Sequence, residues 1–396
     1  MIKIDWSGRS HNFSKKEIQY LSNVIRNADP LTSGNELKIF EKNLAKYLKI
    51  REVFALSSAA AALEIISILC NLKKNNEVIV PAHTYCATAI PFARNGGKLV
   101  WADIDPRTRV ASIDDILKKI TKNTKVIVIV HLYGYAFNVK KLRSKIKNKK
   151  ILIVEDCAQA FGAELNGKKV GTFGDFACYS FHAQKNITTL GEGGAIVVKS
   201  KKLARKVPGL RHNGHCDFAN KRKDYWKPAM GNLDLDVKGI WPYKFTLSEI
   251  QSAAGHLMLK RIDNLNKLRI KRAQFIINGM KEFKELNFLS EFKNYRHVYH
   301  LLSARVNSLK FKRDDLISLL FKKFKIKCVV QYYPLYKYPL FKKMGFGSAN
   351  CENTEAFFDN MISFPFHIWM TNNEMIYMLK SIKKAILILN KNFENK

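Results

Sequence analysis

Short runs of apolar, largely β-branched residues alternate with helical or polar stretches, and this rhythm constrains the fold more than any other feature. The runs are Val53–Leu56, Val78–Val80, Leu99–Trp101, Val126–Val130, Ile151–Val154, Phe176–Ser180 and Ala195–Val198. Strands that are apolar along their length and separated by helices are typical of a mainly parallel sheet covered on both faces. The sequence therefore predicts an α/β fold with a mainly parallel central sheet between helices.

Two other regions show a helical pattern. After a turn signal at Leu31–Gly34, apolar residues recur at helical spacing from Leu37 to Leu48, which predicts an amphipathic helix. Beyond about residue 255 long lysine-rich amphipathic helices dominate, with strand-like pieces near Leu301–Val306 and Lys327–Gln331. This change of pattern predicts a second, smaller α/β domain.

We therefore expect two domains. The large one spans residues 1–255 and includes the N-terminal helical segment, and the small C-terminal one spans residues 256–396. Residues Asn213–Ile240, polar with interspersed aromatics, are expected to form a long functional loop.

The charge of the chain is strongly positive, with 68 Lys and Arg against 33 Asp and Glu, a net charge of +35. Such an excess raises the possibility of a nucleic-acid or anionic-membrane partner. The lysines are dispersed along the whole length rather than gathered in a basic tail, which favours solvated faces instead. We expect no nucleic-acid partner.

The sequence also favours a cytoplasmic protein. Met1–Ser10 lacks the apolar core of a signal peptide, and no apolar stretch is long enough to predict a membrane span. The seven cysteines show no CxxC or other metal-ligand spacing, so we expect reduced thiols and no metal site.

Polar residues follow three of the predicted strands, at the sheet edge where ligands of α/β proteins bind. Glu155 and Asp156 end one buried strand, and another runs into a turn that carries Lys185. The third place is the small-residue turn at Ser57–Ala62, which opens a helix and offers free backbone amides to an anion.

Together these features suggest a cofactor that is a phosphate, an aldehyde and a basic heterocycle, namely pyridoxal 5′-phosphate (PLP). The helix after Ser57 would hold the phosphate, and Asp156 would keep the pyridine nitrogen protonated. Lys185 would form the Schiff base, and Tyr85 could stack on the ring.

The ordered series of motifs resembles the DegT/StrS family of PLP-dependent sugar aminotransferases, which have fold type I. The resemblance runs along nearly the whole chain and rests on Leu31–Gly34, Glu77–Tyr85 with Ala87 and Thr88, Val130–Gly134, Glu155–Ala160, Gly171–Asp175, Ser180–Lys185 and Gly191–Gly194. It implies the fold type I architecture, with a large cofactor-binding domain and a smaller C-terminal α/β domain.

The resemblance also implies roles for individual residues. Lys185 falls where the family has its Schiff-base lysine, and Asp156 matches the partner of the pyridine nitrogen. Gln159 matches the residue beside the phenolic oxygen, Tyr85 the stacking aromatic and Ser180 a phosphate ligand. The implied reaction moves an amino group from glutamate or glutamine to a keto sugar, attached to a nucleotide, for amino-sugar biosynthesis.

The phosphate turn departs from the family pattern. Most relatives have a Gly-Thr pair where this chain has Ala59 and Ala60, so a threonine hydroxyl is missing. Another group must then bind the phosphate together with the amides of Ala60 and Ala61. Family members are homodimers with shared sites, and Lys244 replaces an asparagine in a segment that reaches the neighbouring subunit's phosphate. We expect Lys244 to supply the missing interaction.

The substrate is less constrained. A free keto-cyclitol or another non-nucleotide ketose is an alternative acceptor, and a non-catalytic basic binding protein is the alternative from another class. Arg211–His215 and Gln331–Pro334 resemble regions that line the family's substrate cleft. His182 or His215 could contact substrate, or each could be an ordinary hydrogen-bonded residue.

Overall fold

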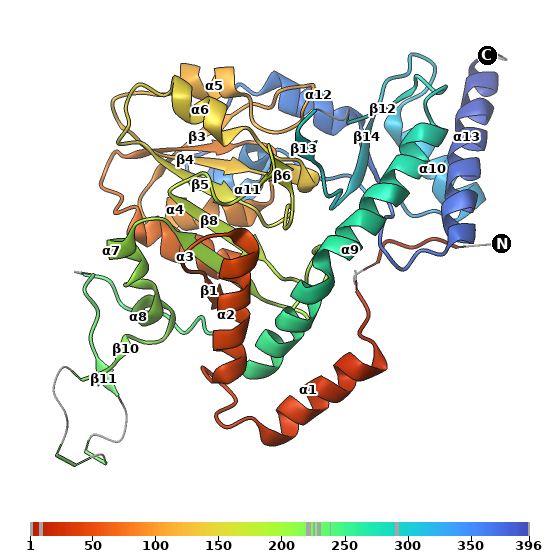
Figure 1. Cartoon of the computed structure of the whole chain (residues 1–396). Helices are drawn as coiled ribbons and strands as arrows, with labels where there is room; N and C mark the ends of the chain where they lie inside the picture. The colour runs from red at the N-terminus through yellow and green to blue at the C-terminus, as the bar shows by residue number, and fades with distance from the viewer. Residues whose placement is uncertain are drawn as a thin grey trace.

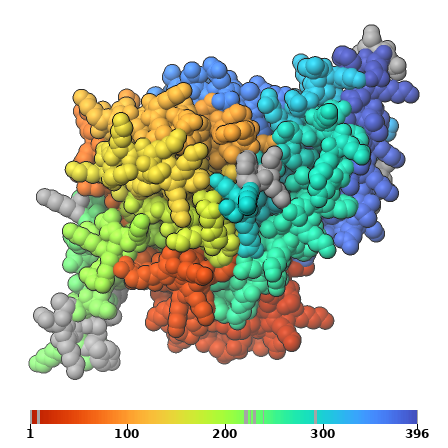
Figure 2. Space-filling view, turned by 45° about the horizontal axis from the view of Figure 1, so that its top comes forward, coloured from red at the N-terminus to blue at the C-terminus, as the bar shows by residue number. Residues whose placement is uncertain are grey.

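The computed structural model describes residues 3–7, 11–218, 223–224, 226–227, 231–237, 239–289 and 293–394. A large lobe built on a seven-stranded sheet and a small lobe with a three-stranded sheet are joined by the long helix α9 (Glu249–Gly279), as Figure 1 shows. The N-terminal helices α1 (Lys15–Asn27) and α2 (Asn35–Leu48) pack against the first part of α9. In Figure 2 they form a red surface beside the teal α9.

The large sheet is mainly parallel, as predicted. Its strands are β1 (Phe54–Leu56), β2 (Glu77–Pro81), β3 (Lys98–Ala102), β4 (Thr124–Val130), β5 (Leu152–Asp156), β8 (Phe176–Ser180) and β9 (Gly194–Val198). They lie in the order β1-β9-β8-β5-β4-β2-β3, and only the pairs of β9 with β8 and β1 are antiparallel. All seven predicted apolar runs are strands of this sheet.

Helices cover both faces of the sheet, and this is why its central strands are apolar throughout. Strands β2, β8 and β9 are buried at every residue. One face is covered by α3 (Ala59–Leu69), α4 (Ile90–Arg94), α7 (Lys201–Ala204) and α8 (Val207–Arg211). The other is covered by α2 and α9 toward β1 and by α5 (Ile113–Lys118) and α6 (Val139–Lys145) toward β3.

The predicted helix from Leu37 to Leu48 is confirmed as α2. Its residues Leu37, Phe40, Leu44 and Leu48 are buried, which is the stripe that the helical spacing predicted. They pack on the same core as Ala177 and Tyr179 of β8.

The small lobe contains the antiparallel sheet β12-β14-β15, flanked by α10 (Arg313–Phe324), α13 (Asn372–Glu394) and the second half of α9. Its strands are β12 (Leu286–Phe288), β14 (Leu302–Val306) and β15 (Met361–Phe364). The predicted strand near Leu301–Val306 is therefore confirmed as β14.

The strand predicted at Lys327–Gln331 is wrong. This stretch makes one isolated bridge, between Val329 and Ser363 of β15, and the preceding Ile326 makes another with Ile4 of the N-terminal segment. Each neighbour pairs at a single residue, so no ladder forms, and the chain then turns inward to bring Gln331 and Tyr332 to a cavity of the large lobe.

The remaining elements are short: η1 (Cys86–Thr88), η2 (Leu132–Gly134), η3 (Leu335–Lys337), α11 (Pro339–Lys343), α12 (Glu352–Asn360), β6 (Glu164–Leu165), β7 (Lys168–Lys169), β13 (Tyr295–Arg296), β10 (His215–Cys216) and β11 (Asn232–Leu233). The segment predicted as a long loop, Asn213–Ile240, lies partly outside the described residues; its described part contains the β10–β11 pair, which lies beyond α8 at one edge of the molecule in Figure 1.

The expected domain boundary after residue 255 lies inside α9. Met258, Leu259 and Ile262 of this helix pack in the core of the large lobe, whereas Ala273 and Ile276 pack in the core of the small lobe. One rigid helix thus belongs to both cores, and the division into two domains stays a prediction.

Within the part of the chain that the structure describes, no helix combines the length and hydrophobicity needed to cross a lipid bilayer.

Candidate active site

A cavity of about 980 Å³ opens at the carboxyl ends of the parallel strands. Seven of the eight residues predicted to act at the site line it: Ala60, Ala61, Tyr85, Asp156, Gln159, Ser180 and Lys185. They come from four separate stretches of sequence, each following or ending a strand of the large sheet, as expected for a site at this edge.

The N-terminus of α3 forms one wall of the cavity. Ser58 caps this helix, and its Oγ accepts a hydrogen bond from the Ala61 amide at 3.0 Å. Ala60, the second residue of the helix, has no acceptor for its amide within the helix and lies exposed in the cavity wall. Of the two predicted phosphate-binding amides, that of Ala60 is open, while that of Ala61 is engaged by its own cap.

Gly194 allows the N-terminus of α3 to lie directly on the sheet. A Cβ at this position would be 2.3 Å from the carbonyl carbon of Ser58 and 2.5 Å from the Ala59 nitrogen. Both are backbone atoms at the helix entry, so any side chain here would push α3 away from β9. The Gly-Gly pair at the end of the turn that carries Lys185 is thus needed for the close packing of α3, which forms another wall of the cavity.

Asp156 ends β5 with its side chain buried, at 4% exposure, in the wall of the cavity. Its Oδ2 accepts a hydrogen bond from Thr88 Oγ1 at 2.8 Å, and its Oδ1 accepts one from the Ala158 amide at 3.0 Å. Both donors are neutral, so neither supplies a counter-charge to this carboxyl group, and a cationic group in the cavity could do so.

Hydrogen bonds to both polar atoms of its amide group orient the Gln159 side chain. Its Oε1 accepts the Tyr133 amide at 2.9 Å, which directs its Nε2 to the hydroxyl of Tyr332 at 3.0 Å. Tyr332 follows the small-lobe helix α10 in sequence but packs on the core of the large lobe, so this hydrogen bond ties that segment to the cavity wall. The resemblance placed this stretch in the substrate cleft but did not indicate the contact with Gln159.

Lys185 lies in the turn after β8, and burial lowers the pKa of its amine to about 8, against the opposing effect of the Asp156 carboxylate. The amine is therefore uncharged at a much lower pH than that of a solvated lysine. A lysine that loses its proton near neutral pH and faces a cavity is suited to act as a nucleophile and as a base.

Two further predictions concern residues around Lys185. The Ser180 side chain lines the cavity at the end of β8, and His182 lines it as well, within 3.8 Å of Glu192. His215, the other candidate for substrate contact, lies instead in a surface groove between α7 and the β10–β11 pair. The structure therefore favours His182 of the two histidines.

Lys244 does not line the cavity of its own chain. Its backbone forms a bridge with His212, its side chain is exposed, and the next residue, Phe245, lines the cavity. In this extended stretch neighbouring side chains point to opposite sides. The role expected of Lys244 at the phosphate of a neighbouring subunit stays a prediction.

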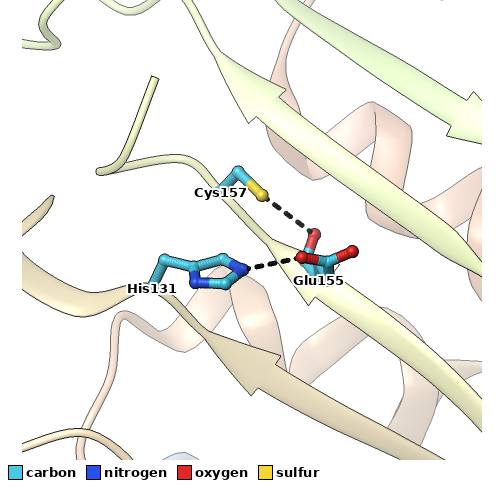
Figure 3. A group of neighbouring side chains, drawn as sticks. All are labelled: His131, Glu155 and Cys157. Carbon is cyan, nitrogen blue, oxygen red and sulfur yellow. Dashed lines mark hydrogen bonds and ion pairs between the residues drawn. The ribbon is translucent and has the colours of Figure 1, made fainter. Parts of the chain in front are cut away.

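His131, Glu155 and Cys157 converge just behind Asp156, as Figure 3 shows, with ligand atoms within 4.8 Å of one another. Glu155 accepts the amides of Gly171 at 2.8 Å and Phe173 at 2.7 Å together with His131 Nε2 at 3.0 Å. The Phe137 amide donates to His131 Nδ1, so both imidazole nitrogens are engaged. These atoms hold the 171–174 turn, and a metal ion would have to break that network.

Comparisons with known proteins agree with this geometry. The family model of the DegT/DnrJ/EryC1/StrS aminotransferase family matches residues 12–383. GDP-perosamine synthase from Vibrio cholerae is 30% identical over 83% of this chain and 85% of its own. The L-glutamine:2-deoxy-scyllo-inosose aminotransferase of Streptomyces kanamyceticus is 34% identical over 65% of this chain and 60% of its own.

A solved structure has the same fold. The putative sugar aminotransferase Spr1654 from Streptococcus pneumoniae, solved in its PMP-form, superposes on this structure with a TM-score of 0.86 and 27% sequence identity. The match covers 97% of this chain and 100% of the Spr1654 chain.

The fold and the site define an aminotransferase of the PLP-dependent class. The chain belongs to the DegT/DnrJ/EryC1/StrS aminotransferase family. The predicted family and fold class are thereby confirmed. Within the site, the role of Thr88 and the contact by which Tyr332 orients Gln159 were not predicted from the sequence. For Thr88 a signal was available, because it lies three residues after Tyr85 in the same motif.

Proposed function

We propose that this enzyme uses PLP, bound in the cavity, to move an amino group from glutamate or glutamine to a keto sugar attached to a nucleotide, in amino-sugar biosynthesis. One observation carries the proposal: the buried Asp156 carboxylate and the Lys185 amine with its lowered pKa line the same cavity. A carboxylate and an amine that loses its proton more readily than a solvated lysine suit the ring nitrogen and the aldehyde of a pyridine aldehyde.

The residues present fit the cofactor. Asp156, with neutral hydrogen-bond donors, calls for a cation such as a protonated ring nitrogen. At the other end, the N-terminus of α3 with the Ala60 amide, and the hydroxyls of Ser57, Ser58 and Ser180, suit a phosphate. Tyr85, exposed to 58%, presents a ring to the cavity for stacking.

When bound, PLP supplies an aldehyde that condenses with amines and a ring that withdraws electrons from the carbon next to the nitrogen. Asp156 holds the proton on the ring nitrogen and so sustains that withdrawal. Lys185 Nζ would be the nucleophile toward that aldehyde and the base that moves a proton between the two carbons on either side of the nitrogen. Gln159, fixed by Tyr133 and Tyr332, orients the ring beside its phenolic oxygen.

The choice of a nucleotide-linked sugar is supported by the cavity and by the relatives. A volume of about 980 Å³ exceeds what the cofactor alone needs, which leaves room for a sugar and part of a nucleotide. GDP-perosamine synthase is similar over most of the chain. The similarity to a 2-deoxy-scyllo-inosose aminotransferase, over a shorter region, keeps a free keto-cyclitol as the alternative.

We further propose a homodimer in which Lys244 of each subunit reaches the phosphate of the other. The exposed Lys244 side chain, turned away from its own cavity, supports this arrangement. All seven cysteines are free thiols, which supports the cytoplasmic location expected from the sequence.

The test follows the cofactor band of the purified enzyme loaded with PLP. Addition of glutamate or glutamine should bleach the visible band, and a keto-sugar nucleotide should restore it. Free ketoses and keto-cyclitols are assayed in parallel, and restoration by these alone would overturn the nucleotide-sugar assignment. A protein whose band ignores every amino donor, yet binds DNA with a steep salt dependence, would instead be the basic binding protein.

A further inference from the structure

The segment ahead of α1 lies against the turn that carries Lys185. His11 Nε2 is 2.8 Å from the backbone carbonyl oxygen of Lys185, although 174 residues separate the two in sequence. The neighbouring Gln184 donates its Nε2 to the Ser7 carbonyl oxygen at 3.1 Å. Two consecutive residues of the lysine-bearing turn are thus held by the N-terminal segment.

The carbonyl acceptor sets the direction of the His11 hydrogen bond. The side chain is buried, at 2% exposure. Burial lowers the pKa of His11 to about 3, and the nearby positive charge of Arg269 acts in the same direction. The imidazole is therefore neutral at physiological pH, and because a carbonyl oxygen only accepts, the Nε2–H group must donate to Lys185.

The segment has a second attachment on the small lobe. The Ile4 amide donates to the Lys325 carbonyl oxygen at 3.0 Å, and the Lys327 amide donates to the Ile4 carbonyl oxygen at 2.9 Å. The Ile4 side chain, at 2% exposure, belongs to the small-lobe core. In Figure 1 a red stretch of the N-terminal trace lies accordingly beside the small lobe. Residues 3–7 therefore connect the small lobe to the Lys185 turn, through Ile4 at one end and the Ser7 carbonyl at the other.

Other contacts hold the turn on its far side. Asn186 Nδ2 donates to Asn266 Oδ1 of α9 at 3.0 Å and to the Val298 carbonyl oxygen at 3.1 Å. The Lys185 amide donates to the His182 carbonyl oxygen at 2.9 Å. These bonds fix the turn before and after Lys185, and His11 fixes the carbonyl of Lys185 itself.

We propose that His11 is a positioning residue for Lys185: by holding the backbone carbonyl of Lys185, it fixes the base of the reactive side chain relative to the cavity. The proposal rests on the proposed role of Lys185 as nucleophile and base. An amine on a flexible four-carbon stem reacts efficiently only if its backbone is held to within about 0.5 Å. His11 supplies that restraint from outside the large-lobe sheet, and Ile4 anchors the segment.

The experiment compares His11→Leu with His11→Gln in the full-length enzyme. The glutamine amide can place a donor near the position of Nε2, whereas leucine fills similar volume without one. We expect His11→Leu to lower kcat about tenfold, the effect of one lost hydrogen bond, with little change in KM. It should also slow the uptake of PLP by the apoenzyme and shift the pH midpoint of the visible band, and His11→Gln should restore both.

Two further variants separate positioning from general destabilisation. Ile4→Asp releases the distant anchor and should reproduce the shifted midpoint of the band without touching His11. His256→Leu removes another histidine of the large lobe, one that contacts Asn43 on α2, and should leave the band and kcat unchanged. Thermal unfolding of every variant is measured alongside.

The outcomes distinguish this proposal from the one on which it rests. Equal losses in His11→Leu and His11→Gln, or a normal band in His11→Leu, would overturn positioning by His11. A loss of kcat in His11→Leu that only tracks a lower unfolding temperature, with an unshifted band, would also overturn it. Turnover by Lys185→Ala would overturn the proposed function itself.

Discussion

The hydroxyl of Thr88 donates a hydrogen bond to Oδ2 of Asp156 at 2.8 Å, across the ends of two different strands of the large sheet. Thr88 lies in η1 after β2, and Asp156 is the last residue of β5. Both side chains are buried, at 1% and 4% exposure. The bond from Thr88 thus holds one oxygen of the Asp156 carboxylate in place, while the Ala158 amide holds the other.

This relationship gives the first prediction. Asp156→Asn removes the negative charge and should slow transamination by at least about a hundredfold, because charge stabilisation at a reacting centre is worth that much. Thr88→Val leaves the charge but loses a hydrogen bond to it, so a loss of about tenfold is expected. Single-turnover decay of the cofactor band measures both.

Thr84→Val is the matched control for that series. Thr84 contacts the Thr88 hydroxyl at 3.1 Å and not Asp156. Its removal should cost less than that of Thr88, and equal losses in the two threonine variants would argue against a specific role of the Thr88 to Asp156 bond.

The second prediction concerns Lys185 itself. Lys185→Ala should bind PLP without the shifted visible band of the wild type and should lose transamination by several orders of magnitude, since both nucleophile and base are gone. Absorbance spectra and turnover assays check this. Retention of more than a few per cent of the activity would show that another group serves as the base.

The third prediction is a pH dependence. The pKa of Lys185 is lowered to about 8 by burial, so the amine is protonated below this pH and free above it. The rate at which the apoenzyme develops its visible band with PLP should therefore rise with pH and level off above a midpoint near 8. Initial rates between about pH 6.5 and 10 test this sign. A midpoint near 10.5, the value of an unperturbed lysine, would contradict it.

The fourth prediction tests the wall made by α3. Gly194→Ala places a Cβ within 2.5 Å of two backbone atoms and should destabilise the fold by roughly 1–3 kcal/mol, because overpacking there displaces the helix entry. It should also weaken PLP binding. Gly209→Ala is the control, since its Cβ would meet mainly the flexible Leu235 side chain at 3.1 Å. Equilibrium unfolding and PLP titration compare the two.

The fifth prediction concerns Lys244. If it reaches the phosphate in a neighbouring subunit, Lys244→Ala should weaken PLP retention about tenfold or more, the effect of one charged hydrogen bond. Lys322→Ala, an exposed lysine on α10, should change nothing. Dialysis of the two variants followed by quantification of retained PLP decides the matter, and equal retention would leave Lys244 as a solvated lysine.

Local pattern predicted much of the fold. The strands of the large sheet, helix α2 and strand β14 lie where apolar runs and helical spacing indicated. The strand expected at Lys327–Gln331 failed because a strand requires neighbours along its length, and this stretch pairs at single residues with Ile4 and Ser363 only. Its residues serve other contacts instead: Cys328 lies in the small-lobe core, Val330 packs on the large-lobe core, and Gln331 lines the cavity.

The candidate site was predictable in part for a related reason. Residues directly after parallel strands converge at one sheet edge whatever the details of packing, so Asp156, Gln159, Ser180 and Lys185 could be grouped from the sequence. Thr88 lies within the same motif as Tyr85, but its bond to Asp156, like the contacts of His11 and Tyr332, joins segments distant along the chain, and no local spacing encodes these partners.

The sequence by itself determined the alternation of strands and helices, and with it the sheet, the position of the site and the residue types that carry the chemistry. These properties follow from periodicity and from polar residues at strand ends, which are local. The tertiary structure decided which groups orient the reactive ones: the Thr88 hydroxyl on Asp156, Tyr332 on Gln159 and His11 on the Lys185 carbonyl. Hydrogen-bond partners and the pKa of a buried amine depend on the surroundings in space, and only folding brings those surroundings together.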